Sequence, residues 1–581
     1  MSPNKPNREA QGAGRDAGQP ACEKVFTFGL WGCGPGRYEG GHEGLLRQMR
    51  RLSMNCLVCA PYVGTGEEEL AEAKQRIALY RRYGVYALPH CSGGVEVFRS
   101  AAEALKDEPN VLAWYIRDEP NPEFVPEFLE YKRALEEAAP GQPAVCLFYR
   151  PDSVRAFSPH QPVMLTDCYP LTYAHDGTSL GPHFALRQGD LAIPAEFAQF
   201  NMWGNRGVLE WMDLCRLYCG DQPHWLTLQA FESGDGRRVR WRGPTVADLR
   251  LQTWMAVAGG AKGINYFHYT TLADGYGNPI PSIHGEHTPL LEEIARLGAE
   301  LTPFGPLLVE TDASAPLSVV ATLRPTAGSG NRIEVRRLRA RNRPVNYLVV
   351  FNNDVLVRSS AQINLSRAFL QNRCVYDLHA LEATSLEESP GGAALAVALE
   401  PGGGRLFAVA SESDFEADAR VVQEGRCQNE AAILEVDYEV AAKSGVDLHQ
   451  TVALREQFGR RIQAGQCAEA LDLIRQCAQA LDRAMRANDK FWRVRQDLGA
   501  VKRTLGRLGG EPEQFAGRLS KAYEGLLRLF WEGKASSIYS EVGALRAMVG
   551  EIEATALRAP AALSKVPVDA KALQRIEKAV D

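Results

Sequence analysis

The stretch Val111-Leu-Ala-Trp-Tyr-Ile-Arg-Asp-Glu-Pro-Asn121 decides how the rest of the chain is interpreted. Its first six residues form a short apolar run, which is typical of a buried strand. Two adjacent carboxylates, Asp118 and Glu119, follow this run, and Pro120 ends the strand because it has no backbone N–H for pairing. A solvated turn with a helix-capping acid would also fit this pattern. In a barrel of alternating strands and helices, however, such a strand end carries catalytic groups.

The segment 25–305 repeats the order strand, loop, helix. Eight apolar segments are predicted to be strands: 25–31, 55–62, 84–90, 111–116, 144–149, 163–168, 224–231 and 263–269. Most are continuous apolar runs, as expected for parallel strands buried on both faces. This rhythm predicts a (β/α)₈ TIM barrel. A doubly wound sheet is the alternative, but Gly32-Cys-Gly34-Pro-Gly36 after the first strand lacks the spacing of a phosphate loop.

Three other regions flank the predicted barrel. Residues 1–24 are polar and rich in Gly, Pro and Ala, which predicts a disordered tail. Short strands and turns at 306–412 predict an antiparallel β-sandwich. Helical patterns dominate 413–581 and predict a helical bundle, through which a homo-oligomer could form. Within the barrel, the long connection between the sixth and seventh strands is expected to be a lid or binding loop.

Composition limits the class of protein. The 581 residues carry 65 basic and 71 acidic side chains, and no basic patch interleaved with aromatics stands out, so no nucleic-acid partner is expected. No apolar run reaches transmembrane length, so no membrane partner is expected either. The 13 Cys residues are scattered without paired spacing, which favours a reducing, cytoplasmic compartment. A removed leader would instead make the protein periplasmic or secreted.

Aromatic and short polar residues occupy the predicted strand ends, where a sugar ring would need flat apolar faces and hydrogen-bonding groups. The candidate substrate-binding residues chosen on this basis are Trp31, Tyr62, His90, Asp167, Tyr169, Tyr266 and His268. Asp167 is the most specific of them, because a carboxylate within an apolar strand requires a partner. For each aromatic residue, simple core packing is the competing explanation.

The predicted barrel, the acid at its fourth strand and the trailing sandwich resemble the retaining glycoside hydrolases of clan A. Those enzymes carry Asn-Glu at this point, with the Glu as acid/base, which the resemblance transfers to Glu119. Asp118 departs from that Asn. The Asp-Glu pair is also similar to the substrate-assisted β-N-acetylhexosaminidases, in which the Asp orients the 2-acetamido group that acts as nucleophile. The resemblance implies hydrolysis of a β-glycosidic bond in an oligosaccharide or glycoside, with retention of configuration, as in polysaccharide degradation.

The second carboxylate of a retaining pair is harder to place. Two acids adjacent in a regular strand face opposite ways, so Asp118 and Glu119 are not expected to act as that pair. Clan A places its nucleophile at the end of the seventh strand, where this chain has Trp225-Leu-Thr-Leu-Gln-Ala-Phe-Glu232. That register puts Gln229 near the position, so Gln229 is a further candidate substrate-binding residue, and Glu232 follows in the loop as the candidate nucleophile. Asp167 is the alternative second carboxylate.

No cofactor or metal is expected. His284 and His287 lie in a Gly/Pro loop and are interpreted as loop residues. Two other function classes stay open at this point. The first is a non-catalytic carbohydrate-binding barrel, and the second is a metal-dependent hydrolase or lyase on the same fold.

Overall fold

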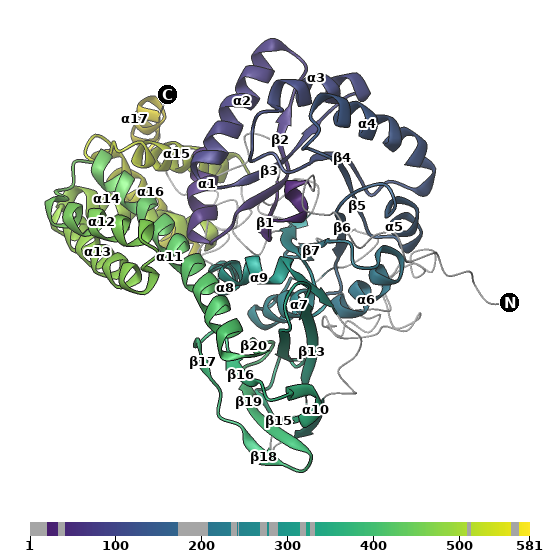
Figure 1. Cartoon of the computed structure of the whole chain (residues 1–581). Coiled ribbons are helices and arrows are strands. Elements are labelled where there is room, and N and C mark those ends of the chain that lie inside the picture. Colours follow the sequence, from purple (N-terminus) through teal and green to yellow (C-terminus); the bar gives the residue numbers. More distant parts are fainter. Residues whose placement is uncertain are drawn as a thin grey trace.

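The structure is a computed structural model. It describes residues 20–32, 41–171, 207–233, 241, 243–267, 276–277, 289–313, 321–325, 332–507, 513–558 and 569–580. Three parts follow one another along the chain: a barrel, a pair of antiparallel sheets beside it, and a group of helices that packs against the barrel on another side (Figure 1).

The barrel contains all eight predicted strands. They are β1 (Thr27–Trp31), β2 (Cys56–Val63), β3 (Tyr86–Cys91), β4 (Trp114–Asp118), β5 (Ala144–Phe148), β6 (Met164–Cys168), β7 (His224–Gln229) and β9 (Gly263–Phe267). They pair in parallel in the order β3-β2-β1-β9-β7-β6-β5-β4. A single parallel bridge between Ala87 and Val111 joins the two ends of this order. The fold is therefore the predicted (β/α)₈ barrel.

Helices cover the outside of the barrel. They are α1 (Gly41–Arg51), α2 (Glu67–Arg82), α3 (Val95–Leu105), α4 (Val125–Ala138), α5 (Pro151–Phe157), α6 (Val208–Cys219), α7 (Val246–Ala258) and α8 (Pro289–Leu301). Short elements complete this part: η1 (Ala21–Glu23), η2 (Pro122–Phe124), η4 (Thr302–Phe304), α9 (Gly305–Val309) and a hairpin of β8 (Glu232–Ser233) with β10 (Tyr276–Gly277).

Large side chains fill the inside of the barrel. Trp31, Tyr115, Leu147 and Trp225 belong to one buried cluster there. Cys22 belongs to the same cluster and is 1% exposed, although the sequence predicts disorder for residues 1–24. Burial of an apolar side chain at this point holds η1 against the barrel. Residues 1–19 lie outside the described part of the chain.

The second part consists of two packed antiparallel sheets. Their strands are β11 (Thr311–Ala313), β12 (Ala321–Pro325), β13 (Ile333–Ala340), β14 (Asn346–Asn352), β15 (Ser359–Ser366), β16 (Cys374–Asp377), β17 (Glu382–Ala383), β18 (Glu387–Ser389), β19 (Gly392–Leu399) and β20 (Gly404–Ala410), with the short helix α10 (Arg367–Leu370) after β15. Leu348 and Val350 of β14 face the four-stranded sheet, whereas Tyr347 and Val349 join the large core shared with the barrel. The six-stranded sheet is thus buried on both faces, and this anchors the sandwich to the barrel.

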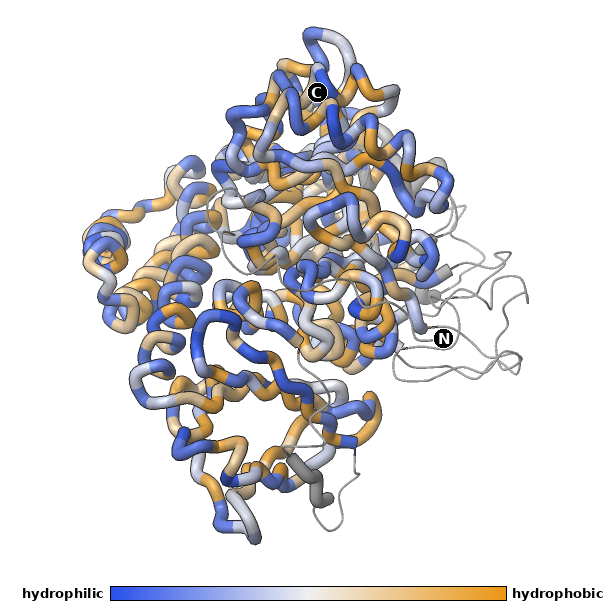
Figure 2. Tube along the Cα trace, turned by 45° about the vertical axis from the view of Figure 1, so that its right-hand side comes forward, coloured by the Kyte–Doolittle hydropathy of each residue, from blue (hydrophilic) through white to orange (hydrophobic). Residues whose placement is uncertain are grey.

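The third part is helical. It contains α11 (Glu412–Lys443), α12 (His449–Gln463), α13 (Cys467–Ala487), α14 (Asp489–Arg507), α15 (Glu513–Trp531), α16 (Tyr539–Arg558) and α17 (Ala570–Val580). Hydrophobic and hydrophilic residues alternate along these helices (Figure 2). The apolar residues of α12 to α17 pack in a separate core, to which α11 contributes some of its buried residues. Arg47 of α1, 1% exposed, pairs with Glu439 of α11 and lies over the ring of Trp531, so charge as well as apolar packing joins these helices to the barrel. None of the helices in the described ranges combines the length and apolarity needed to cross a bilayer.

Candidate active site

The end of β4 departs from a regular strand. Tyr115 pairs with Val145 of β5, but the next pair is Arg117 with Cys146, so one extra residue forms a β-bulge. Beyond the bulge Asp118, rather than Arg117, lies on the same side as Tyr115. The Tyr115 hydroxyl donates a hydrogen bond to Asp118 Oδ1 at 2.7 Å. The Arg117 guanidinium points elsewhere and lies over the Phe124 ring.

Glu119 has a backbone conformation that is rare for its residue type. Its φ of 45° is in the left-handed region, which non-glycine residues seldom adopt. The Glu119 N–H still donates to the carbonyl oxygen of Leu147 at 3.1 Å, so the residue closes the strand while the chain turns away at Pro120. Strained residues of this kind concentrate at functional sites. The bulge and this turn together bring both acids of the pair into the barrel mouth, contrary to the expectation from strand alternation.

Asp167 near the end of β6 completes a cluster of three carboxyl groups. Its side chain is 2% exposed. It is hydrogen-bonded to Glu119 and to the Tyr169 hydroxyl, while its Oδ1 atom is buried without a hydrogen-bond partner among the described residues. Asp118, Glu119 and Asp167 therefore act on one another electrostatically, although Asp167 belongs to a different strand. We name these three residues the carboxylate cluster.

The cluster changes the acidity of its members. Burial, then the charges of Asp167 and Asp118, raise the pKa of Glu119 furthest. Burial and the Asp118 charge also raise the pKa of Asp167, although hydrogen bonds to Glu119 and Tyr169 oppose the rise. Asp118 keeps contact with solvent, yet the protein packed around it raises its pKa, while the Tyr115 hydrogen bond and His90 lower it. Like charges in a confined space favour retention of one proton, and the raised pKa values of Glu119 and Asp167 place that proton within this pair.

Aromatic side chains surround the cluster. Trp31 packs its ring edge-on against Tyr115, with centroids 5.0 Å apart. The half-buried His90 contacts the rings of Tyr62 and Tyr115, and Tyr62 is 37% exposed at the rim. Tyr169 lies beside Phe231 and Phe267 at the ends of β7 and β9. Of the predicted substrate-binding residues, the structure thus brings Trp31, Tyr62, His90, Asp167 and Tyr169 to the carboxylate cluster or its rim.

Two other predicted substrate-binding residues have different surroundings. Tyr266 is fully buried, and its hydroxyl lies 2.8 Å from Thr253 Oγ1 of α7, so the side chain faces the outer helices. Strand alternation puts it on the outside of the barrel, which corrects the prediction. Gln229 is also fully buried, and its amide bonds to the backbone of Leu171 and Phe231. It ties the chain after β6 to the end of β7, and its amide faces backbone instead of a sugar.

The predicted nucleophile Glu232 lies apart from the cluster. It begins the hairpin strand β8, and its side chain is exposed. Its Oε2 atom lies against the backbone at Gly243, 3.2 Å from the place that a Cβ would occupy there. The charges that shift the pKa of Glu119 are those of Asp167 and Asp118 and do not include Glu232. His268, together with His284, His287 and residues 172–206 of the expected lid, lies outside the described residues.

Two residues of this site were not predicted. Tyr115 looks in the sequence like part of an apolar run, and only the bulge gives its hydroxyl a carboxylate partner. Tyr149 follows β5, and burial with the charge of Glu119 raises its pKa, so it borders the cluster. The signal for Tyr149 was present, because it ends the fifth strand just as the chosen aromatics end theirs.

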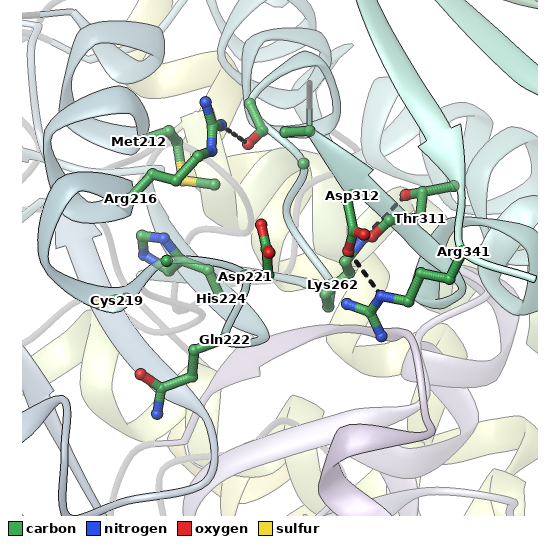
Figure 3. A pocket seen from close by; sticks show the side chains of 14 residues that line it. Met212, Arg216, Cys219, Asp221, Gln222, His224, Lys262, Thr311, Asp312 and Arg341 are labelled. Atoms are coloured by element: carbon green, nitrogen blue, oxygen red, sulfur yellow. Dashed lines mark hydrogen bonds and ion pairs between the residues drawn. The ribbon is translucent and has the colours of Figure 1, made fainter. Parts of the chain in front are cut away.

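The cavity in Figure 3 lies at the opposite end of the barrel. Its lining includes His224 and Lys262, which stand at the amino-terminal ends of β7 and β9, and Arg341 next to β13. It measures about 30 Å³, and the Lys262 amine is held by Leu308 O at 2.6 Å and by two Thr311 oxygens. In barrels of this type residues at that end support stability, whereas chemistry occurs at the carboxyl-terminal end. Within the described ranges, no group of His, Cys, Asp and Glu is arranged to hold a metal ion.

Comparison with known proteins yields no family model that matches the chain and no match among curated proteins. Solved structures resemble it at low identity. A β-galactosidase from Marinomonas ef1 is 11% identical over 49% of this chain and 62% of its own, with a TM-score of 0.36. A family 5 glycoside hydrolase from Bacteroides vulgatus is 12% identical over 67% and 90%, with a TM-score of 0.44. A family 51 α-L-arabinofuranosidase from Thermotoga petrophila is 9% identical over 68% and 97%, with a TM-score of 0.35. The alignment spans less than two thirds of the galactosidase, and likenesses this distant carry no functional argument, which therefore rests on the site.

Proposed function

We propose that the protein is a glycoside hydrolase that cleaves a β-glycosidic bond with retention of configuration, with Glu119 as its general acid and base. The observation that carries the proposal is the environment of Glu119. Burial and two flanking carboxylates raise its pKa at the carboxyl-terminal mouth of the barrel, so it holds a proton at neutral pH. A carboxylic acid in this state can protonate a leaving glycosidic oxygen.

The geometry favours the 2-acetamido group of the substrate as nucleophile. A retaining pair of enzyme carboxyls must be about 5–5.5 Å apart to accommodate the sugar between them. Asp167 is hydrogen-bonded to Glu119 and is therefore too close to serve as that partner. Glu232 is exposed on the β8 hairpin. Asp118 is solvent-accessible, adjacent to the acid and oriented by Tyr115, as required of a group that binds the N–H of a 2-acetamido sugar.

The reaction would proceed in two steps. Glu119 gives its proton to the glycosidic oxygen while the C1–O bond breaks and the acetamido oxygen forms a bond to C1. Asp118 stabilises the positive charge that develops on the acetamido nitrogen. Glu119, now a carboxylate, takes a proton from water as the water oxygen attacks C1 and the bond to the acetamido oxygen breaks. The products are the free 2-acetamido sugar and the alcohol, and Glu119 has regained its proton.

A panel of aryl β-glycosides with and without a 2-acetamido group tests the proposal. Turnover of the 2-acetamido members only, with the β-configured sugar as first product by NMR, supports it. Sugar binding by calorimetry without turnover of any member would instead indicate the non-catalytic carbohydrate-binding barrel.

Single substitutions test the roles within the site. Glu119→Gln should lower kcat by about 10²–10⁴-fold, the usual contribution of a general acid. Glu123→Gln makes the same change at an exposed position of η2 and serves as the matched control. Asp118→Asn should impair 2-acetamido substrates far more than 2-hydroxy ones. If Glu232→Ala abolished turnover and azide restored it, Glu232 would be the nucleophile and substrate assistance would be wrong.

A further inference from the structure

Tyr115 occupies a position between the barrel core and the carboxylate cluster. Its side chain is 1% exposed, and its ring packs against Trp31 and His90. Its hydroxyl donates to Asp118 Oδ1 at 2.7 Å. The Tyr115 carbonyl oxygen lies 3.0 Å from His90 Nδ1. Because a carbonyl oxygen can only accept a hydrogen bond, His90 carries a proton on Nδ1. Tyr115 is therefore held by packing against two rings and by hydrogen bonds at its hydroxyl and its carbonyl oxygen.

The contact between Tyr115 and Asp118 depends on the β-bulge. Residues three apart in a regular strand point to opposite faces. The extra residue in β4 turns Asp118 to the face of Tyr115, so a fully buried phenol reaches a solvent-accessible carboxylate. A bulge that re-aims a side chain next to a site is a recurring device in β-strands.

The groups that act on Asp118 come from several strands. Those that the structure places around it are His90 on β3, Tyr115 and Glu119 on or after β4, Cys146 on β5, and Asp167 and Tyr169 on or after β6. Among these, the Tyr115 hydroxyl is the neutral donor that bonds directly to Asp118. Asp167 and Glu119 already bond to each other.

We infer that Tyr115 is a positioning residue, whose hydroxyl keeps Asp118 ionised and directed into the barrel mouth. This inference rests on the proposed function. With Asp118 satisfied by Tyr115, the single proton of the cluster stays between Glu119 and Asp167, where the general acid needs it. Tyr115 thereby makes Asp118, and not the buried Asp167, the carboxylate that meets the substrate.

The variant Tyr115→Phe tests the inference, because it removes one oxygen and keeps the ring. We expect kcat on a 2-acetamido aryl β-glycoside to fall about 10- to 100-fold, the equivalent of one hydrogen bond to a charged group. KM should change little, since the interaction strengthens as charge develops. Without the hydroxyl the pKa of Asp118 rises further, so the acidic limb of the pH profile of kcat/KM should move to higher pH.

Tyr347→Phe is the matched control. Tyr347 is equally buried and donates a 2.8 Å hydrogen bond to the carboxylate of Asp418, far along the chain from the cluster. Tyr347→Phe should change the stability of the protein and leave the pH profile of kcat/KM unchanged. If Tyr115→Phe also left the profile in place and lost activity only in proportion to folded protein, the positioning role would be refuted.

A second measurement separates this inference from the proposed function. If the wild-type chain hydrolysed no glycoside of the panel, the proposed function would fail, and ¹³C NMR of labelled aspartate carboxyls in the full chain would decide on Tyr115. Asp118→Asn identifies the Asp118 signal. A higher titration midpoint for Asp118 in Tyr115→Phe supports the inference, and an unchanged midpoint overturns it.

Discussion

Replacement of Asp167 by Asn tests whether the charge of this neighbouring carboxylate keeps Glu119 protonated. The carboxyl of Asp167 is 2% exposed and is hydrogen-bonded to Glu119, whose pKa it raises by its negative charge. In the variant Asp167→Asn an amide that is neutral at every pH takes the place of this carboxyl, so we expect the pKa of Glu119 to fall. The general acid would then lose its proton at a lower pH than in the wild type.

The size of the expected fall in the pKa of Glu119 follows from the electrostatic interaction between the two carboxylates. Two unit charges about 4 Å apart interact by about 4 kcal/mol at an effective dielectric constant near 20. This is an upper bound, because solvent reaches Asp118 at the barrel mouth and screens the cluster. Half of that interaction, about 2 kcal/mol, still changes an ionisation constant more than tenfold. The alkaline limb of the pH profile should therefore move toward neutrality by more than about one pH unit.

The assay is kcat/KM against pH on an aryl 2-acetamido β-glycoside with a poor leaving group, which depends most on the acid. At pH values below the shifted limb, Asp167→Asn should retain most of its activity. Asp418→Asn, at a fully buried aspartate of α11, controls for lost stability. An alkaline limb that stays in place or moves to higher pH would refute the reasoning, since Asp167 would then not be holding the proton on Glu119.

Three further substitutions, the first with a control variant, test what holds the parts together. A Cβ at Gly404 would lie 2.1 Å from the Trp254 ring, so Gly404→Ala should destabilise the barrel–sandwich junction by about 1–3 kcal/mol and lower the Tm measured by calorimetry. Gly459→Ala is the control: Gly459 lies in α12 with open space around it, so this change should raise Tm slightly. Lys262→Met removes the donor to three buried oxygens at the amino-terminal end of the barrel, and each acceptor left unsatisfied costs about 1–3 kcal/mol; an unchanged urea midpoint would contradict this. Arg47→Met removes the buried charge between α1 and α11. We expect faster amide exchange along both helices and unchanged exchange in the sandwich.

Much of the fold follows from local pattern. Parallel strands buried on both faces produce continuous apolar runs, and the eight predicted runs coincide with the eight barrel strands. The helical region predicted at 413–581 is also observed, and it begins with α11. Its 32 residues bury only scattered positions against the barrel, the sandwich and the other helices, so it shows little apolar periodicity. A helix that packs on several neighbours at once has no single apolar stripe to detect.

The structure brings together three acids that the sequence placed at strand ends. Position at a strand end identified Glu119, Asp118 and Asp167, because parallel strands end at one face of a barrel. The same rule failed for Tyr266, where only the parity of β9 decides whether a side chain points inward. It failed for Gln229 for another reason, because the side-chain amide of Gln229 is hydrogen-bonded to the backbone of Leu171. Residue type alone reveals neither which face of a strand a side chain occupies nor which backbone groups it bonds.

The barrel, the carboxyl-terminal ends of its strands and the acids at those ends follow from the chain, because periodicity and strand order are properties of the chain. Which of these acids meet depends on how the folded strands and turns lie in space. The bulge in β4 turns Asp118 toward Tyr115, the left-handed turn at Glu119 brings its carboxyl to Asp167, and Glu232 is left outside. Acidity depends on burial and on charges a few ångströms away, and residues distant in the chain supply both, so the raised pKa of Glu119 exists only in the folded protein.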